Sequence, residues 1–282
     1  MLAGVLGDVN HDLRFDFVGY WVTKPDYISA AGGFSYLATG PIAKSPCVLG
    51  TSFDEGCAFT KVDPAFDITP QAQSQWGLPW AQQTQDMDGD GRNDLVFGTY
   101  ASGGASDTVV YLMLGKGDGT FAGAKQMFTQ PGGKGPANSF LFADFTNDKL
   151  GDVLMGFDDD GDAGSGWLYP GTGPGAFSQN GSKVIDLNPS CNDWCGDNMG
   201  FSGSARPFDF NFDGSMDVVV GYSYCENAPN CYMWAAGDSK IELYLGNGDG
   251  TFKAPVLVYK VLGNTEANSF AIPTRICPWY KL

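Results

Sequence analysis

The sequence has little positive charge and only one histidine. Its 282 residues include 16 lysine and arginine residues against 32 aspartate and glutamate residues, so the formal net charge is −16 at pH 7. Nucleic-acid binding requires a cationic surface, and anionic membrane surfaces repel an acidic chain. No apolar run approaches the roughly 18 residues that a membrane-spanning helix needs. We therefore expect neither a nucleic-acid partner nor membrane insertion.

Motifs of common hydrolases are also missing. The sequence contains neither the Gly-x-Ser-x-Gly turn that presents a nucleophilic serine nor the His-Glu-x-x-His motif of zinc peptidases. The single histidine, His11, lies inside an acidic loop. The clustered carboxylates belong to such loops, and no pair stands out as a general acid and base. The sequence therefore favours a protein without catalytic activity.

No Cys-x-x-Cys pair occurs among the seven cysteines, which disfavours a zinc site. Six of the cysteines form close pairs in the sequence: Cys47 and Cys57, Cys191 and Cys195, and Cys225 and Cys231. This spacing favours disulfides and hence an oxidising, extracellular compartment. The bonds can join the three local pairs or cross between the second and third pairs. Cys277 then remains, either as a free thiol or for a bridge to another chain.

Two further features bear on the compartment. Residues 1–6 are apolar, but the segment is too short for a signal peptide and lacks a basic start. We therefore expect a mature secreted form or a piece of a longer protein. Asn180 opens one glycosylation acceptor, Asn180-Gly181-Ser182, although such tripeptides also arise by chance.

Glycine and aromatic residues are abundant. The chain has 40 glycines and 14% aromatic residues, and strong helix formers are few. Aromatic residues favour strands, and glycine favours tight turns. The composition therefore predicts an all-β fold of strands joined by tight turns.

A nine-residue acidic loop occurs four times, each time followed by apolar residues and a glycine. Counted from the first aspartate, positions 1, 3, 5, 7 and 9 are Asp8, Asn10, Asp12, Arg14 and Asp16; Asp86, Asp88, Asp90, Arg92 and Asp94; Asp144, Thr146, Asp148, Leu150 and Asp152; and Asp209, Asn211, Asp213, Ser215 and Asp217. Polar turns that contain aspartate by composition alone would not recur in this register. The loops are therefore interpreted as metal sites.

The ligand types in the loops suit calcium. Positions 1, 3, 5 and 9 carry side-chain oxygens, and position 7 can offer its backbone carbonyl, as in an EF-hand loop. Magnesium prefers fewer protein ligands and keeps its waters. The second loop has four aspartates, whereas Thr146 and Lys149 weaken the third. We expect two to four Ca²⁺ ions, because clustered carboxylates without a cation would repel one another.

A glycine-rich turn follows each acidic loop downstream. Its clearest copies, residues 114–121 and 245–252, both follow the pattern Leu-Gly-x-Gly-Asp-Gly-Thr-Phe. Each repeat then contains a strand, the acidic loop, two strands, the glycine-rich turn and a fourth strand. Four strands at a period of roughly 60 to 80 residues suit the blade of a β-propeller.

We expect one β-propeller-like domain over residues 1–282, built from four-stranded antiparallel blades. The approximate repeats are 1–66, 67–130, 131–188 and 189–263, followed by an extra strand and tail over 264–282. The extra strand is expected because residues 267–275 are similar to the strand that leads into the third acidic loop. Four blades can close with the help of this strand, or an open array can complete itself with a neighbouring chain.

The motifs at 86–98 with 114–121, and at 209–221 with 245–252, resemble the FG-GAP/VCBS repeat family. Blades of this family form integrin-α-like, Ca²⁺-binding β-propellers. The resemblance implies a Ca²⁺ loop between the first two strands of each blade. It also implies adhesion, glycan binding or scaffolding. Family propellers commonly have seven blades, whereas four repeats are visible in this sequence.

These features lead to three alternative functions. The first is an extracellular binding or adhesion module for a glycan or protein ligand, with Trp21, Tyr100 and Tyr222 as ligand-binding residues unless these rings pack between blades. The second is a structural protomer that binds copies of itself through its C-terminal strand. The third, implied by the resemblance alone, is a sugar-active lyase, which the missing catalytic motifs disfavour.

Overall fold

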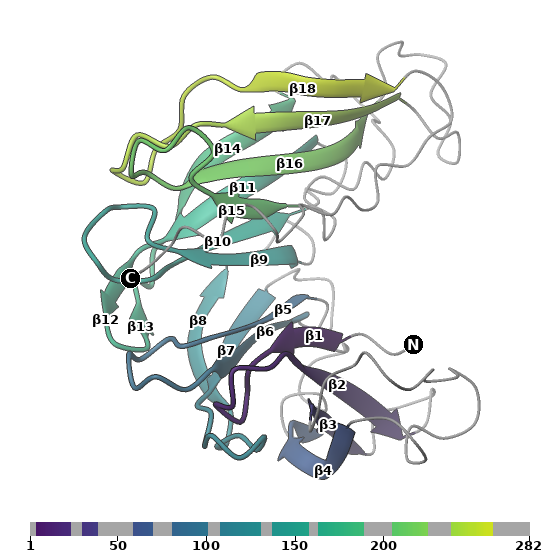
Figure 1. The fold of residues 1–282 in the computed structure, drawn as a ribbon. Coiled ribbons are helices and arrows are strands. Elements are labelled where there is room, and N and C mark those ends of the chain that lie inside the picture. The colour runs from purple at the N-terminus through teal and green to yellow at the C-terminus, as the bar shows by residue number, and fades with distance from the viewer. Residues whose placement is uncertain are drawn as a thin grey trace.

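The computed structural model describes residues 4–23, 30–38, 59–69, 81–100, 108–130, 137–157, 163–188, 205–224 and 238–261. These segments form β-strands and connecting turns, which confirms the all-β class (Figure 1). Among them, no helix is long and apolar enough to cross a membrane. All seven cysteines and the extra strand expected over 264–282 lie outside the described residues, so these expectations stay predictions.

Four four-stranded sheets follow one another along the chain. The first contains β1 (Gly4–Gly7), β2 (Asp16–Thr23), β3 (Ala30–Ala38) and β4 (Phe59–Asp67); the second, β5 (Ala81–Gln85), β6 (Asp94–Tyr100), β7 (Thr108–Met113) and β8 (Lys125–Gln130); the third, β9 (Ala137–Ala143), β10 (Asp152–Phe157), β11 (Ala163–Tyr169) and β14 (Ser182–Asn188); the fourth, β15 (Arg206–Phe208), β16 (Asp217–Tyr224), β17 (Asp238–Tyr244) and β18 (Val256–Val261). A small hairpin, β12 (Gly171–Gly173) and β13 (Ala176–Phe177), lies between β11 and β14. Neighbouring strands pair antiparallel in chain order, which confirms the predicted four-stranded blades.

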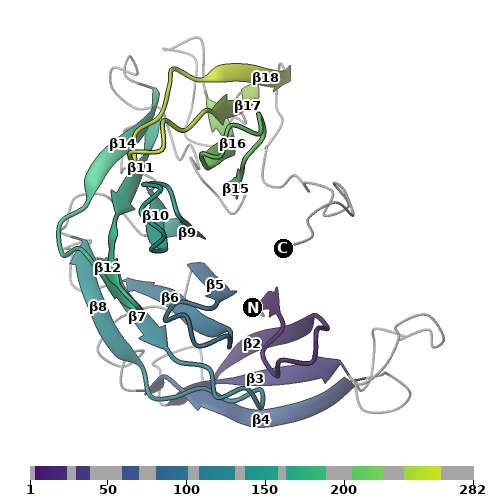
Figure 2. The same ribbon diagram turned by 60° about the vertical axis from the view of Figure 1, so that its left-hand side comes forward.

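The sheets are arranged along an arc (Figure 2). The first strand of each sheet lies on the inner side, where β1 contacts β5, β5 contacts β9, and β9 contacts β15. The first and fourth sheets extend in opposite directions from these inner strands (Figure 2). Consecutive propeller blades have this arrangement, and the described strands form an open arc. Both alternatives, closure with the help of the C-terminal strand and an open array completed by a neighbouring chain, therefore stay predictions.

Three apolar cores fill the spaces between successive sheets. Because side chains alternate between the two faces of a strand, Leu95 and Phe97 of β6 pack toward the first sheet, while Val96 packs toward the third. In β10, Val153 and Leu154 divide in the same way. Middle strands are thus buried on both faces, which explains the continuous apolar runs that follow the acidic loops.

Neighbouring sheets are also joined by a repeated backbone hydrogen bond. In the second, third and fourth repeats, the N–H group of a glycine in the glycine-rich turn donates to the carbonyl at position 2 of the preceding sheet's acidic loop. These bonds join Gly119 to Val9 (3.2 Å), Gly175 to Met87 (2.7 Å) and Gly250 to Phe145 (3.0 Å). The side chain of each accepting residue is buried. We call this hydrogen bond and the apolar core around it the inter-sheet joint.

Candidate metal centre

A buried aspartate occupies position 9 of every acidic loop. Asp16, Asp94, Asp152 and Asp217 each begin the second strand of their sheet, and each has no exposed surface. In the second loop, the Asp94 Oδ2 atom accepts the N–H of Met87 at 2.8 Å, and its Oδ1 atom accepts the N–H of Gly115 at 2.8 Å. Hydrogen bonds to a carboxylate are among the stronger ones in proteins, so this aspartate fastens the acidic loop to the glycine-rich turn.

The same pair of bonds recurs in the other three loops. The donors are Val9 and Ala38 to Asp16, Phe145 and Gly171 to Asp152, and Phe210 and Gly246 to Asp217, at distances between 2.8 and 2.9 Å. Sequence reasoning assigned position 9 a metal-binding role and missed this structural one. The signal that could have revealed it is the Leu-Gly pair that opens each clear glycine-rich turn.

The close approach of the two segments explains that glycine. A Cβ atom on Gly115 would lie 2.1 Å from the carbonyl oxygen of Asn93, and one on Gly246 would lie 2.2 Å from that of Met216. A side chain at either position would therefore force the glycine-rich turn away from the buried aspartate.

Position 1 organises the rest of each loop. In the second loop, Asp86 Oδ1 accepts the N–H of Gly89 at 2.7 Å, and Oδ2 accepts the N–H of Gly91 at 2.9 Å. Position 6 is left-handed in all four loops, with φ values of 67° at Leu13, 86° at Gly91, 72° at Lys149 and 88° at Gly214. The first and third loops thus adopt the same conformation without the glycine that favours it.

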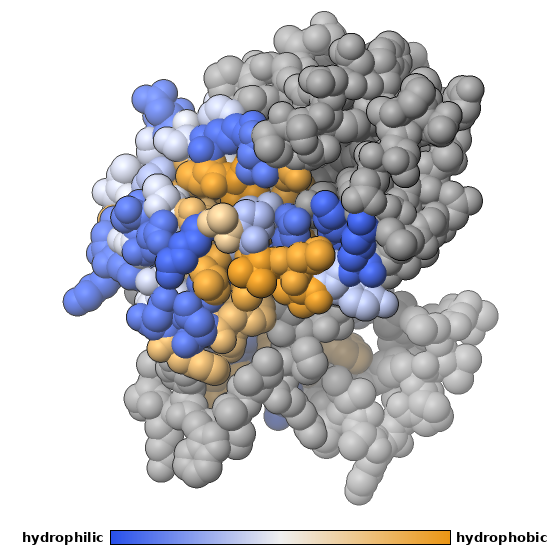
Figure 3. All heavy atoms as spheres, turned by 90° about the horizontal axis from the view of Figure 1, so that it is seen from above, coloured by the Kyte–Doolittle hydropathy of each residue, from blue (hydrophilic) through white to orange (hydrophobic). Residues whose placement is uncertain are grey.

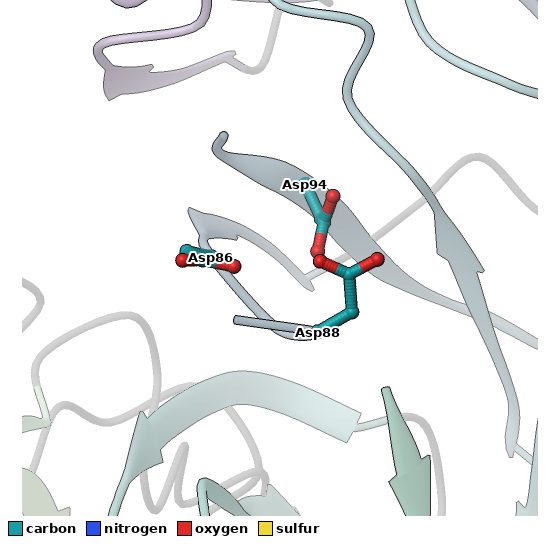
Figure 4. A group of neighbouring side chains, drawn as sticks. All are labelled: Asp86, Asp88 and Asp94. Atoms are coloured by element: carbon teal, nitrogen blue, oxygen red, sulfur yellow. The ribbon is translucent and has the colours of Figure 1, made fainter. Parts of the chain in front are cut away.

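The second loop brings three carboxylates together. Ligand oxygens of Asp86, Asp88 and Asp94 all lie within 4.8 Å of one another. Figure 4 shows the carboxylates of Asp88 and Asp94 facing each other, with Asp86 beside them. Burial first, and then the charges of Asp88 and Asp90, raise the pKa of Asp94 to about 6, although the hydrogen bonds from Gly115 and Met87 lower it. An all-oxygen group of this kind suits a hard divalent cation.

The position-5 carboxylates are not part of this group. Asp90 binds the guanidinium of Arg92, with Nε at 2.8 Å from Oδ2, and this bond holds the pKa of Asp90 below its usual value. Asp12 pairs with Arg14 at 2.9 Å in the same way. The sequence predicted both aspartates as ligands, and it did not anticipate that the residue at position 7 would bind them.

The other three loops assemble fewer acids at their centres. Among the described residues, the second loop alone gathers three acidic ligand atoms. Asn10 and Asn211 stand at position 3 of the first and fourth loops, and each accepts the N–H of the position-5 aspartate. Thr146 of the third loop instead donates its hydroxyl to Asp152 at 3.2 Å. The second loop is therefore the best-formed candidate.

The remaining predicted site residues lie apart from the acidic loops. Trp21, Tyr100 and Tyr222 stand in β2, β6 and β16, but their side chains are outside the described part of the protein. Asn180 is exposed in the turn between β13 and β14. Its glycosylation stays a prediction.

The sheets and loops define a repeat protein in which each four-stranded blade carries one acidic loop. The family model of the FG-GAP-like repeat matches residues 86–155, which run from the second acidic loop into β10. This match identifies that segment as FG-GAP-like repeat sequence and confirms the FG-GAP resemblance drawn from the motifs at 86–98 and 114–121. None of the curated proteins matches the chain.

The close approach at Gly115 can be tested by adding one methyl group. We expect Gly115→Ala to lower the free energy of unfolding by about 1–3 kcal/mol, because the new Cβ would collide with the carbonyl of Asn93. Gly123→Ala is the matched control, since a Cβ at Gly123 meets nothing within 4 Å. Urea unfolding measures both variants, and equal stabilities would contradict the proposed contact.

Asp94 gives the metal-free protein a pH dependence. Its pKa in the folded state, about 6, lies above the ordinary 3.8, so the folded state favours the protonated carboxyl. The stabilisation is thus present below about pH 4 and is lost as the pH rises through about 6. In chelator, the wild type should lose stability over this window relative to Asp94→Asn. If the free energies of unfolding of the wild type and of Asp94→Asn, measured with denaturant, changed equally with pH, this assignment would be contradicted.

Proposed function

We propose that the protein is a calcium-stabilised, non-enzymatic binding module of the extracellular space. The observation that carries the proposal is the group formed by Asp86, Asp88 and Asp94. The FG-GAP-like repeat sequence of the chain and its blade-like sheets support a β-propeller-like module. Calcium binding, the ligand and the compartment are the parts that experiments must test.

Calcium fits the charge and chemistry of the second loop. Its ligand atoms are oxygens, which Ca²⁺ and Mg²⁺ both accept, but three protein carboxylates suit Ca²⁺ better because Mg²⁺ retains more water. A divalent ion would also stabilise the ionised form of Asp94, whose pKa burial raises. Asp86, Asp88 and Asp94 would hold the ion. The other loops, with asparagine or threonine at position 3, would bind more weakly.

The ion would act on the arrangement of the sheets. The loop that contains the three carboxylates lies between β5 and β6, and the carbonyl of its Met87 accepts the N–H of Gly175 from the third sheet. A cation that fixes this loop would therefore also fix the joint between the second and third sheets. The proposed role of calcium is structural, and it prepares the surface for a partner.

The proposed partner is a glycan or a protein. Trp21, Tyr100 and Tyr222 follow the acidic loops in three of the four sheets, and aromatic faces near polar groups suit sugar recognition. Screening against a glycan array in millimolar Ca²⁺ should give hits that chelator abolishes. An array without hits would remove the glycan form of the proposal and leave a protein partner.

Calcium binding can be tested through stability. Calcium at a hundredfold excess over its Kd should add about 2.7 kcal/mol per occupied site, and magnesium should add less. Asp88→Asn should lose the contribution of the second loop, because it removes one of the three carboxylates. Asp186→Asn, which changes an exposed aspartate on β14, is the control and should respond as the wild type does.

The measurements are melting curves with calcium and with chelator, supported by calorimetric titration. Identical melting of the wild type under both conditions would contradict the proposed role of calcium. A calcium response that Asp88→Asn retains in full would contradict the assignment to the second loop.

A further inference from the structure

The fourth sheet presents the same surface that the next sheet covers in the first three repeats. One position on the outer strand can be compared across the four sheets. It comes directly after a β-bulge and pairs with the third strand, and the pairs are Phe66 with Gly33, Phe128 with Val110, Ile185 with Gly166, and Tyr259 with Ile241. The first three side chains are 6%, 1% and 2% exposed, whereas Tyr259 is 58% exposed. This position is buried wherever a further sheet follows.

The acidic loop of the fourth sheet shows the same difference. Position 2 is buried at Val9, Met87 and Phe145, where the next sheet's glycine donates to its carbonyl. At Phe210 the side chain is only half-buried, and no such donor occurs within the described segments. Val256 pairs with Leu243 on the same face as the pair of Tyr259 and Ile241, and the exposed Val256 and Val258 of β18 add to this apolar surface. Figure 3, which looks down on the fourth sheet, shows apolar side chains flanked by hydrophilic ones. We call this surface, with Phe210 and Tyr259, the trailing face.

The first sheet presents the complementary half of the same interface. Phe17 pairs with Tyr36 across β2 and β3, as Leu95 pairs with Met113 and Val153 pairs with Tyr169 in the next two sheets. Those four later residues are buried, whereas Phe17 and Tyr36 are half-buried. Phe34 lies between their rings, with centroid distances of 6.1 Å to Phe17 and 5.3 Å to Tyr36. We call these three aromatic residues the leading face.

We propose that the trailing face of one chain binds the leading face of a second copy, so that two copies close a ring of eight sheets. The contact would continue an interface that the protein already forms three times. A ring of eight blades is within the range of known propellers, and twofold-symmetric pairs are the most common oligomers. The opposite directions of the first and fourth sheets in Figure 2 suit half of such a ring.

The mass of the full chain in calcium buffer tests the proposal, measured by light scattering and by sedimentation at about 1 to 50 µM. A pair of chains is expected. Tyr259→Asp should weaken pairing by at least about 30-fold, as expected for an anchor residue at an interface. Phe17→Asp should do the same from the leading face. Lys125→Asp, which changes an exposed residue of β8 at the place that Val256 holds on β18, should leave pairing unchanged.

Mixing the two variants identifies the geometry. Tyr259→Asp retains an intact leading face, and Phe17→Asp retains an intact trailing face, so an equimolar mixture should form pairs through one interface. Each variant alone should pair more weakly than the mixture, because both of its interfaces carry the substitution, and circular dichroism checks that both variants are folded. A monomer across the concentration range, a filament, or a pair that Tyr259→Asp does not weaken would each overturn the proposal.

Discussion

One buried carboxylate per repeat determines how the sheets of this protein fit together. At position 9 of each acidic loop, an aspartate without exposed surface accepts one N–H from the loop and one from the end of the third strand. Burying a charge is costly unless hydrogen bonds or opposite charge compensate. Two backbone donors provide part of that compensation in every repeat. In the second repeat, the carboxylates of Asp86 and Asp88 lie near Asp94, so a divalent cation bound there would compensate the buried charge further.

The acidic loop and the packing of neighbouring sheets are parts of one arrangement. The residue at position 2, such as Met87, donates its N–H to the buried aspartate of its own sheet. Its carbonyl accepts an N–H from the glycine-rich turn of the next sheet. A change in loop shape is therefore transmitted directly to the joint between sheets. At the two ends of the arc, within the described residues, Phe17 is half-buried and Tyr259 is exposed, whereas the equivalent residues between sheets are buried.

The sequence predicted the features that repeat along it. The acidic loops, the strands after them and the glycine-rich turns recur in the same order. The number of four-stranded sheets and the pairing of their strands could therefore be inferred before the structure was known. The side-chain directions could not. Asp90 has the residue type of a ligand, but Arg92, two residues later, binds its carboxylate. The need for glycine at position 115 also escaped prediction, because it depends on the carbonyl of Asn93, which folding brings close.

Diffraction from a crystal grown with calcium tests the central claim most directly. The account predicts an anomalous peak in the second acidic loop, with oxygen atoms of Asp86, Asp88 and Asp94 at about 2.3–2.6 Å from the ion. The hydrogen bonds from Met87 and Gly115 to Asp94 should remain in place around it. A second loop without the ion at millimolar calcium, or an Asp94 that has turned away from these donors, would contradict the account.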